Sequence, residues 1–160
     1  MKAIRSLLLG LALLCPAFAM AQDFPNKPIR LIVPFPPGGP NDIIARTVAH
    51  RMSDILKQPI VIDNKGGQGG VLGTDIVAKS NPDGYTIGVV SAGALAISPS
   101  MEKVAYDTLK DLQPITLVAK VPEMLEVATS VPANNMAELV ALAKKEPGKL
   151  NFASSGPGSL

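Results

Sequence analysis

Short apolar runs alternate with amphipathic stretches along most of this chain. The apolar runs at residues 29–35, 60–63 and 85–90 predict strands, and apolar residues at helical spacing predict helices from about 42 to 57 and from 72 to 79. Strands that alternate with helices are typical of βαβ units, whose strands run parallel in one sheet. The pattern therefore predicts an α/β fold built on a largely parallel sheet.

The first predicted helix has favourable starting residues and one apolar face. Asn41 is a residue type preferred at the N-cap, and Asp42 in the first turn suits the positive end of the helix dipole. The apolar face is expected to consist of Ile44, Val48, Met52 and Ile55. We therefore expect Asn41 to cap the helix and this face to pack on the sheet.

The pattern changes after residue 110. Residues 115–121 and 124–129 are expected to be extended, and 150–153 is predicted as the last strand, with Phe152 in the core. Asn135 and Glu138 form a capping-box pair, which predicts a helix over residues 136–145. The chain stops in a glycine- and serine-rich stretch where a further helix is expected to begin. We therefore expect the 160 residues to be a fragment of a longer protein.

The first 21 residues have the three parts of a secretion signal. Lys2 and Arg5 supply the positive start, residues 6–14 form the apolar run, and Ala19 and Ala21 place small residues at the −3 and −1 positions of a signal-peptidase site. The run is short for a membrane span, which needs about 20 apolar residues; a retained N-terminal anchor is the alternative. We predict cleavage after Ala21, export to the periplasm and no stable membrane insertion of the mature chain.

Removal of residues 1–21 changes the net charge and the cysteine content of the chain. The chain has 15 Lys and Arg against 13 Asp and Glu, and the signal takes away Lys2 and Arg5 with no acidic residue, which leaves the charge balanced. The basic residues form no stripe, so no nucleic-acid partner is expected. Cys15, the only cysteine, leaves with the signal, which excludes disulfides and thiolate metal sites in the mature chain.

Three loops rich in small residues follow predicted strands and precede helices or expected helices. In α/β sheets such loops lie at the carboxyl ends of the strands, where ligands bind, and helix N-termini present N–H groups that suit an anion. None of the three loops contains Lys or Arg, so we expect an anion to be held by backbone N–H and hydroxyl groups. The expected ligand-binding residues are Phe35, Pro37, Gly38, Gly39, Asn41 and Asp42 in the first loop, Ser91, Ala92 and Gly93 in the second, and Ser154, Ser155, Gly156 and Ser159 in the third.

Two interpretations of these loops stay open at this point. They are either ligand-binding loops or ordinary βα turns, since every βα unit needs one. Asp42 is likewise either a structural residue of the first helical turn or a polar contact to a ligand amine or hydroxyl. Gly39 is expected to take a backbone conformation that a β-branched residue resists.

Motifs for nucleotide binding and catalysis are missing from the sequence. There is no Gly-Lys-Ser/Thr, and the glycines at 67–73 resemble a dinucleotide fingerprint only loosely and follow the second strand instead of the first. The only histidine, His50, falls mid-helix and is expected to be solvated, and the sequence has no Gly-x-Ser-x-Gly and no metal-ligand cluster. We therefore expect no enzyme activity, no cofactor and no metal.

Four stretches of the chain resemble one known family. They are PNKPIRLIVPFPPGG at 25–39, DIIAR at 42–46, NPDGYT at 81–86 and PGKLNFASSG at 147–156. In this order they are similar to the Bug or TctC-like extracytoplasmic solute receptors, the binding components of tripartite tricarboxylate transporters. The resemblance covers the whole chain after residue 21, but members of this family are considerably longer.

The resemblance implies a periplasmic-binding-protein type II fold, in which a small carboxylate is closed between two lobes. It implies a first lobe at residues 22–120 and the beginning of a second lobe at 121–160. Loops 35–42 and 91–93 would line the first side of the site, and 154–159 would begin the second. It also implies integral membrane transporter subunits as partners. A sensory ligand-binding subunit, an exported enzyme and a truncated non-functional remnant are the alternatives.

Overall fold

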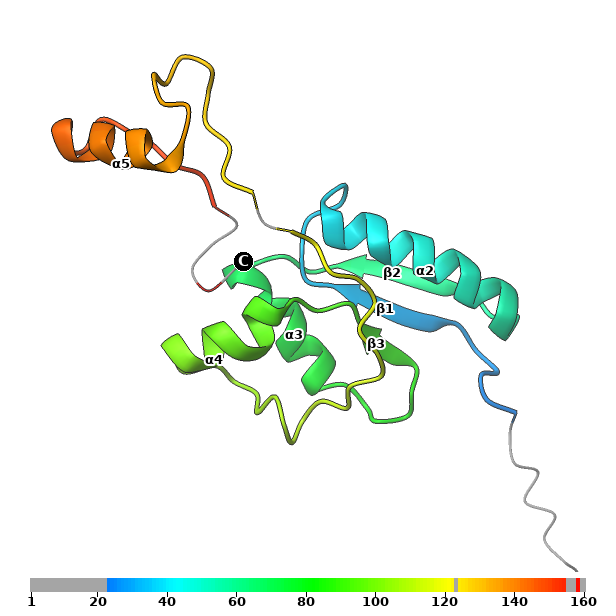
Figure 1. Cartoon of the computed structure of the whole chain (residues 1–160). Coiled ribbons are helices and arrows are strands. Elements are labelled where there is room, and N and C mark those ends of the chain that lie inside the picture. The colour runs from blue at the N-terminus through cyan, green and yellow to red at the C-terminus, as the bar shows by residue number, and fades with distance from the viewer. Residues whose placement is uncertain (1–22, 123, 155–157, 159–160) are drawn as a thin grey trace, which may run out of the picture.

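The computed structural model describes residues 23–122, 124–154 and 158 (Figure 1). The predicted signal, residues 1–21, and the candidate residues Ser155, Gly156 and Ser159 lie outside the described residues. In the part of the chain that is described, no helix combines the length and the apolar character needed to cross a membrane.

Three short strands form one parallel sheet. β1 (Ile29–Val33) lies in the middle, between β2 (Ile60–Asn64) and β3 (Thr86–Gly88), and pairs in parallel with both. β1 is almost entirely apolar because both of its neighbours are strands and both of its faces are covered, so that four of its five residues are buried. The predicted parallel α/β arrangement is confirmed, although β1 and β3 are shorter than the apolar runs that predicted them.

Helices cover both faces of the sheet (Figure 1). On one face, α2 (Pro40–Leu56) packs with β1 in a buried cluster formed by Leu31, Val33, Ala45 and Ala49. On the other face, α3 (Val71–Ala78) lies against β3, since a Cβ built on Gly88 would lie 2.8 Å from Val77 Cγ2. The missing side chain at Gly88 therefore allows α3 to approach the sheet closely.

The start and the packing face of α2 differ from the predictions. Gly39 occupies the N-cap position in place of Asn41, because Pro40 begins the helix, where its missing N–H and its fixed φ are tolerated. Ile55 is 73% exposed, so its place on the predicted apolar face is wrong. The buried positions of the helix are Asp42, Ala45 and Ala49. Small alanines let α2 lie close to β1, and the larger Ile44, Val48 and Met52 of the predicted face are only partly buried.

Short helical turns precede α3 and follow β3. A 3₁₀ turn, η1 (Gln68–Gly70), leads into α3, and after β3 the π-helical η2 (Gly93–Ile97) continues into α4 (Ser98–Met101). The hydroxyl of Tyr106 donates a hydrogen bond to the Ala94 carbonyl, and Thr108 Oγ1 donates to the Leu95 carbonyl at 2.8 Å. These bonds hold the start of η2 in place behind the loop that follows β3.

Residues 24–27 are fixed to the turn before β3 in an arrangement that we call the N-terminal clamp. The rings of Phe24 and Tyr85 meet edge to face, with 5.0 Å between their centroids, and the Tyr85 hydroxyl is hydrogen-bonded to Asn26 at 2.9 Å. Lys27 Nζ lies 4.1 Å from the centre of the Tyr85 ring. A Cβ on Gly84, whose φ is +80°, would lie 2.9 Å from the Phe24 ring, so both the turn and the packing require glycine there.

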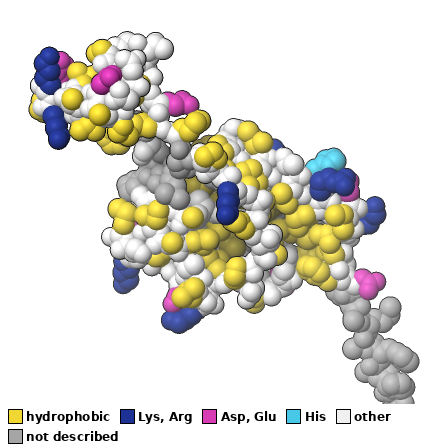
Figure 2. Space-filling model, viewed as in Figure 1, with side chains coloured by type: hydrophobic (Ala, Val, Ile, Leu, Met, Phe, Trp, Pro, Cys, Tyr) yellow, Lys and Arg dark blue, Asp and Glu magenta, His cyan; other side chains and the backbone are white. Residues whose placement is uncertain are grey.

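Residues 124–154 contain the helix α5 (Met136–Lys145), and its prediction is confirmed. The Asn135 side chain caps this helix by accepting the N–H of Glu138 at 3.0 Å. The strand predicted at 150–153 does not form, and Phe152 is 93% exposed, so its predicted core position is wrong. Apolar side chains of α5 face solvent (Figure 2), because the described residues provide no second layer to cover them.

Candidate functional site

The first two candidate loops meet at one end of the sheet. β1 runs into residues 34–39 and β3 into residues 89–92, and these two strands are neighbours. The chain leaves β1 toward β2 through α2, then crosses back past β1 to β3 through α3. Such a reversal of strand order leaves a crevice at the carboxyl ends of the strands, and α/β proteins bind ligands there.

Asp42 ties the first loop to α2 and to the end of β2. Its Oδ2 accepts the N–H of Gly38 at 2.9 Å and the Nε–H of Arg46 at 2.8 Å. Its Oδ1 accepts the side-chain amide of Asn64 at 2.9 Å, and the same amide donates to the Phe35 carbonyl at 3.0 Å. The Asp42 side chain is only 3% exposed, so a buried carboxylate fixes the loop. We call these five residues the Asp42 network.

The network keeps Asp42 ionised. The hydrogen bond from Arg46 has the largest influence on its pKa, followed by those from the Gly38 N–H and from Asn64. Together they hold the pKa of Asp42 well below the usual value for an aspartic acid, although burial acts in the opposite direction. Both carboxylate oxygens face groups of this chain, which supports the structural interpretation of Asp42.

The glycine-only conformation in the first loop falls one residue earlier than expected. Gly38 has a φ of +86°, whereas the φ of Gly39 is −76°, which any residue adopts. The expectation for Gly39 was therefore wrong. The first bond of the helix runs from the Ile43 N–H to the Gly39 carbonyl at 3.0 Å. The N–H groups of Asn41 and Asp42 precede that bond, at the free end of α2.

The ring of Phe35 links the first loop to the two loops beside it. A Cβ built on Gly70 would lie 3.2 Å from Phe35 Cζ and 3.5 Å from Ala94 Cβ. The ring therefore packs against the turn before α3, next to the start of η2. In the second candidate loop, Ser91 Oγ accepts the Ala94 N–H at 3.3 Å, which caps the first turn of η2.

The structure brings the first and second loops together and describes only part of the third. Pro37 and Ala92 are exposed, while Gly93 is buried beneath the second loop. Ser154 is exposed at the end of the described segment. Gly158 lies against α4, since a Cβ built on it would be 3.3 Å from the Ser98 Cα.

Three residues take part in the site without having been predicted. Arg46 follows Asp42 by four residues, a spacing that brings side chains together on a helix, so a local pattern for this pair exists. Asn64 and Gly70 have no such pattern. Asn64 reaches Asp42 and Phe35 across 22 and 29 residues of chain, and only the fold creates those contacts.

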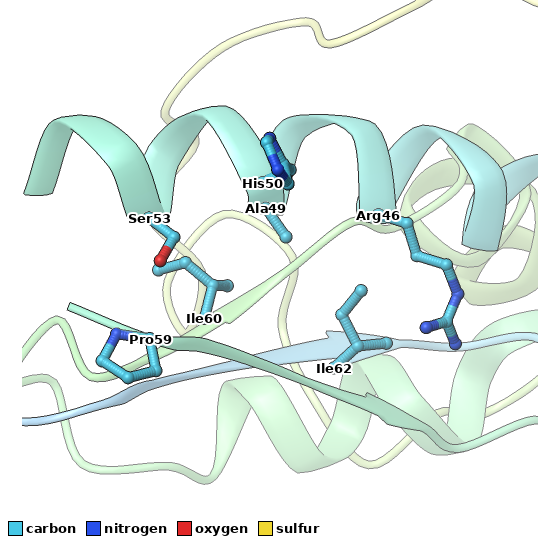
Figure 3. A pocket seen from close by; sticks show the side chains of 7 residues that line it. All are labelled: Arg46, Ala49, His50, Ser53, Pro59, Ile60 and Ile62. Atoms are coloured by element: carbon cyan, nitrogen blue, oxygen red, sulfur yellow. The ribbon is translucent and has the colours of Figure 1, made fainter. Parts of the chain in front are cut away.

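A shallow hollow of about 380 Å³ lies between α2 and the outer strand β2 (Figure 3). It is lined by Arg46, Ala49, His50, Ser53, Pro59, Ile60 and Ile62. The hollow follows the flank of the sheet and reaches the Asp42 network only at Arg46. The side chain of His50 at its rim is 80% exposed. Among residues 23–122, 124–154 and 158, no three His, Cys, Asp or Glu side chains gather where they could hold a metal ion.

Comparison with known families identifies the class of protein that this fold and these loops belong to. The model described as "Tripartite tricarboxylate transporter family receptor", TctC, matches residues 44–160. The chain belongs to this receptor family, as the resemblance of its motifs implies. Protein BugT of Bordetella pertussis is 43% identical over 141 residues, which are 87% of this chain and 43% of BugT. The chain thus spans less than half the length of that relative.

Two solved structures share the fold over most of this chain. The periplasmic binding protein BugD is 34% identical with a TM-score of 0.72, covering 85% of this chain and 46% of BugD. Rpa4515 of R. palustris, described with adipate, is 34% identical with a TM-score of 0.77, covering 86% of this chain and 46% of that one. The predicted periplasmic-binding-protein fold is therefore confirmed for this chain, which covers under half of each.

Proposed function

We propose that the protein captures a small carboxylate in the periplasm for the membrane subunits of a tripartite tricarboxylate-type transporter. The observation that carries the proposal is the meeting of two strand-following loops at the free start of α2, in a chain of the TctC family. TctC and Bug proteins are periplasmic solute-binding proteins. Rpa4515, described with adipate, a dicarboxylate, supports a small carboxylate as the ligand.

The ligand carboxylate is bound by backbone groups at the start of α2. The Gly38 N–H is turned inward to Asp42, so the donors of the first loop are the N–H groups of Gly39, Asn41 and Asp42. These groups share the positive end of the helix dipole, which attracts an anion. Ser91, Ala92 and Gly93 line the neighbouring loop, and residues 154–159 close over the ligand from the second lobe.

The two lobes divide the chain near residue 120. In this proposal, residues 22–120 belong to the first lobe and residues 121–160 begin the second. The packing of β1, β2, β3, α2 and α3 into one sheet with two covered faces supports this division, since α5 has no buried residue and shares in none of that core.

Titration calorimetry of the full-length protein with linear mono- and dicarboxylates tests the proposed function. We expect at least one of them to bind with a Kd of about 1 μM or tighter, a free energy of about −8 kcal/mol. Amino acids, sugars and nucleotides at the same concentrations serve as controls. Binding of a control compound, with none of the carboxylates bound, would contradict the proposal.

Gly38→Ala is expected to weaken carboxylate binding about tenfold. A side chain at a φ of +86° costs about 1–2 kcal/mol in the left-handed region, so the loop changes conformation and the Gly38 N–H leaves Asp42. Gly39→Ala is the matched control, because its φ is ordinary and its Cβ would meet only the Pro36 carbonyl at 3.6 Å. Calorimetry on both variants measures the effect. A greater loss for Gly39→Ala than for Gly38→Ala would show that this account of the loop is wrong.

The exported protein is expected to begin at Gln22. The small residues Ala19 and Ala21 direct cleavage after Ala21. Intact-mass spectrometry of protein from the periplasmic fraction measures the new N-terminus. Ala21→Lys places a large charged residue at the −1 position and is expected to leave the precursor uncut. A periplasmic mass that retains residues 1–21 in the unaltered protein would contradict cleavage.

A further inference from the structure

A buried negative charge lies where the proposed function places an anionic ligand. Asp42 belongs to the first turn of α2, and its side chain is 3% exposed. The low pKa of this carboxyl group keeps it ionised at neutral pH. Like charges repel strongly at short range in partly buried sites. A ligand carboxylate at the start of α2 is therefore opposed by Asp42 unless a nearby positive charge balances it.

Arg46 is the charged group that provides this balance. Asp42 accepts hydrogen bonds from the Gly38 N–H, from Asn64 and from Arg46, and of these donors only Arg46 carries a charge. The Arg46 Nε lies 2.8 Å from Asp42 Oδ2, one helical turn along α2. The Arg46 side chain is half exposed, and its terminal nitrogens lie at the edge of the hollow beside Ile62 (Figure 3).

We propose that Arg46 sets the ligand charge that this site accepts, because its guanidinium neutralises Asp42 and so permits a dicarboxylate to bind at the start of α2. The inference rests on the proposed function and names the residue that makes the site tolerant of two negative charges. Arg46 acts here as a positioning residue, through Asp42, and needs no contact with the ligand. The loops themselves supply no cation, so this pair controls the local charge.

Loss of the guanidinium charge should weaken binding in proportion to the ligand's charge. Arg46→Gln retains a side-chain N–H donor for Asp42 but leaves the carboxylate uncompensated. We expect about a fivefold loss of affinity for a monocarboxylate and about a twentyfold loss for a dicarboxylate of the same length. A purely structural role for Arg46 would weaken both ligands equally. High salt screens exposed charges, so in high salt the losses of affinity that Arg46→Gln causes for the two ligands should become more similar.

The experiment is calorimetry on the full-length protein with two matched pairs of probes, succinate with butyrate and adipate with hexanoate. Arg46→Lys keeps the charge and is expected to restore most of the preference for the dicarboxylate. Arg51→Gln is the matched control, because Arg51 lies on the same helix but pairs with the exposed Asp54 at 3.7 Å, away from the loops. Its ratio of mono- to dicarboxylate Kd is expected to equal that of the unaltered protein.

A second single variant keeps the inference testable if Arg46→Gln does not fold. Asp42→Asn leaves the Arg46 charge unbalanced, so the ratio of mono- to dicarboxylate Kd is expected to rise above that of the unaltered protein even though both affinities fall. Equal losses for both ligands in Arg46→Gln, or an unchanged or lowered ratio in Asp42→Asn, would overturn the inference and leave the proposed function standing. Failure of the unaltered protein to bind any carboxylate would overturn the proposed function, and this inference with it.

Discussion

Gly73→Ala is expected to lower the free energy of unfolding by about 2–3 kcal/mol, the upper part of the range for overpacking a tight contact. A Cβ at position 73 would lie 2.8 Å from the Lys65 carbonyl oxygen, 2.8 Å from Pro34 Cα and 2.9 Å from Pro34 Cβ. Main-chain atoms and a proline ring cannot rotate away, so α3 must move off the end of β1. Urea unfolding of the two proteins measures the difference.

A second glycine gives the control for this substitution. Gly39→Ala adds the same methyl group where the nearest atom is a carbonyl oxygen at 3.6 Å, and its expected effect on unfolding is below about 1 kcal/mol, the usual cost of alanine at an N-cap position. If Gly73→Ala were as well tolerated as Gly39→Ala, the close approach of α3 to Pro34 would be wrong.

Asp42→Asn is expected to reduce carboxylate affinity at least tenfold and to destabilise the fold at neutral pH. The asparagine amide presents a donor to Arg46 or to Asn64, which are themselves donors, so one of these bonds is replaced by a repulsive contact. The Gly38 N–H then loses its charged acceptor and the loop at the start of α2 is released. Calorimetry measures the affinity, and thermal unfolding measures the stability.

The pH dependence of Asp42→Asn has a definite sign. The folded-state pKa of Asp42 lies below its unfolded value, so the stabilisation is complete above about pH 4 and is lost as pH falls through the folded-state pKa. The difference in free energy of unfolding between the unaltered protein and Asp42→Asn should thus be constant near neutral pH and become smaller in acid. A difference in free energy of unfolding that grows on acidification would contradict an ionised Asp42.

The fold could be predicted wherever the chain interacts with near neighbours. Apolar runs and helical spacing located the three strands and α2, and the Asn135–Glu138 pair located α5, because caps and periodicity are local properties. The strand at 150–153 was overpredicted, since a strand needs a partner that no local pattern supplies. The packing face of α2 was misjudged at Ile55 because close contact with β1 favours the smaller Ala45 and Ala49.

The loops of the candidate site could be predicted from the sequence, but the hydrogen bonds inside the site could not. The glycine-rich sequence after β1 pointed to a ligand loop, but it did not show which glycine has the positive φ, since that depends on where Pro40 starts the helix. Asn64 bridges Phe35 and Asp42 only because β2 lies beside β1 in the sheet. Contacts of this kind follow from strand order, and no local pattern around Asn64 reports that order.

The N-terminal clamp determines where the protein can be labelled or immobilised. It lies beside the first residue of β1, while the candidate loops follow the last residue, and five strand residues at about 3.3 Å each separate the two ends. A fluorophore or biotin joined ahead of residue 23 would therefore lie at the opposite end of the sheet from the loops. A sensor chip coated through that end would hold every molecule with its loops facing the flowing solution.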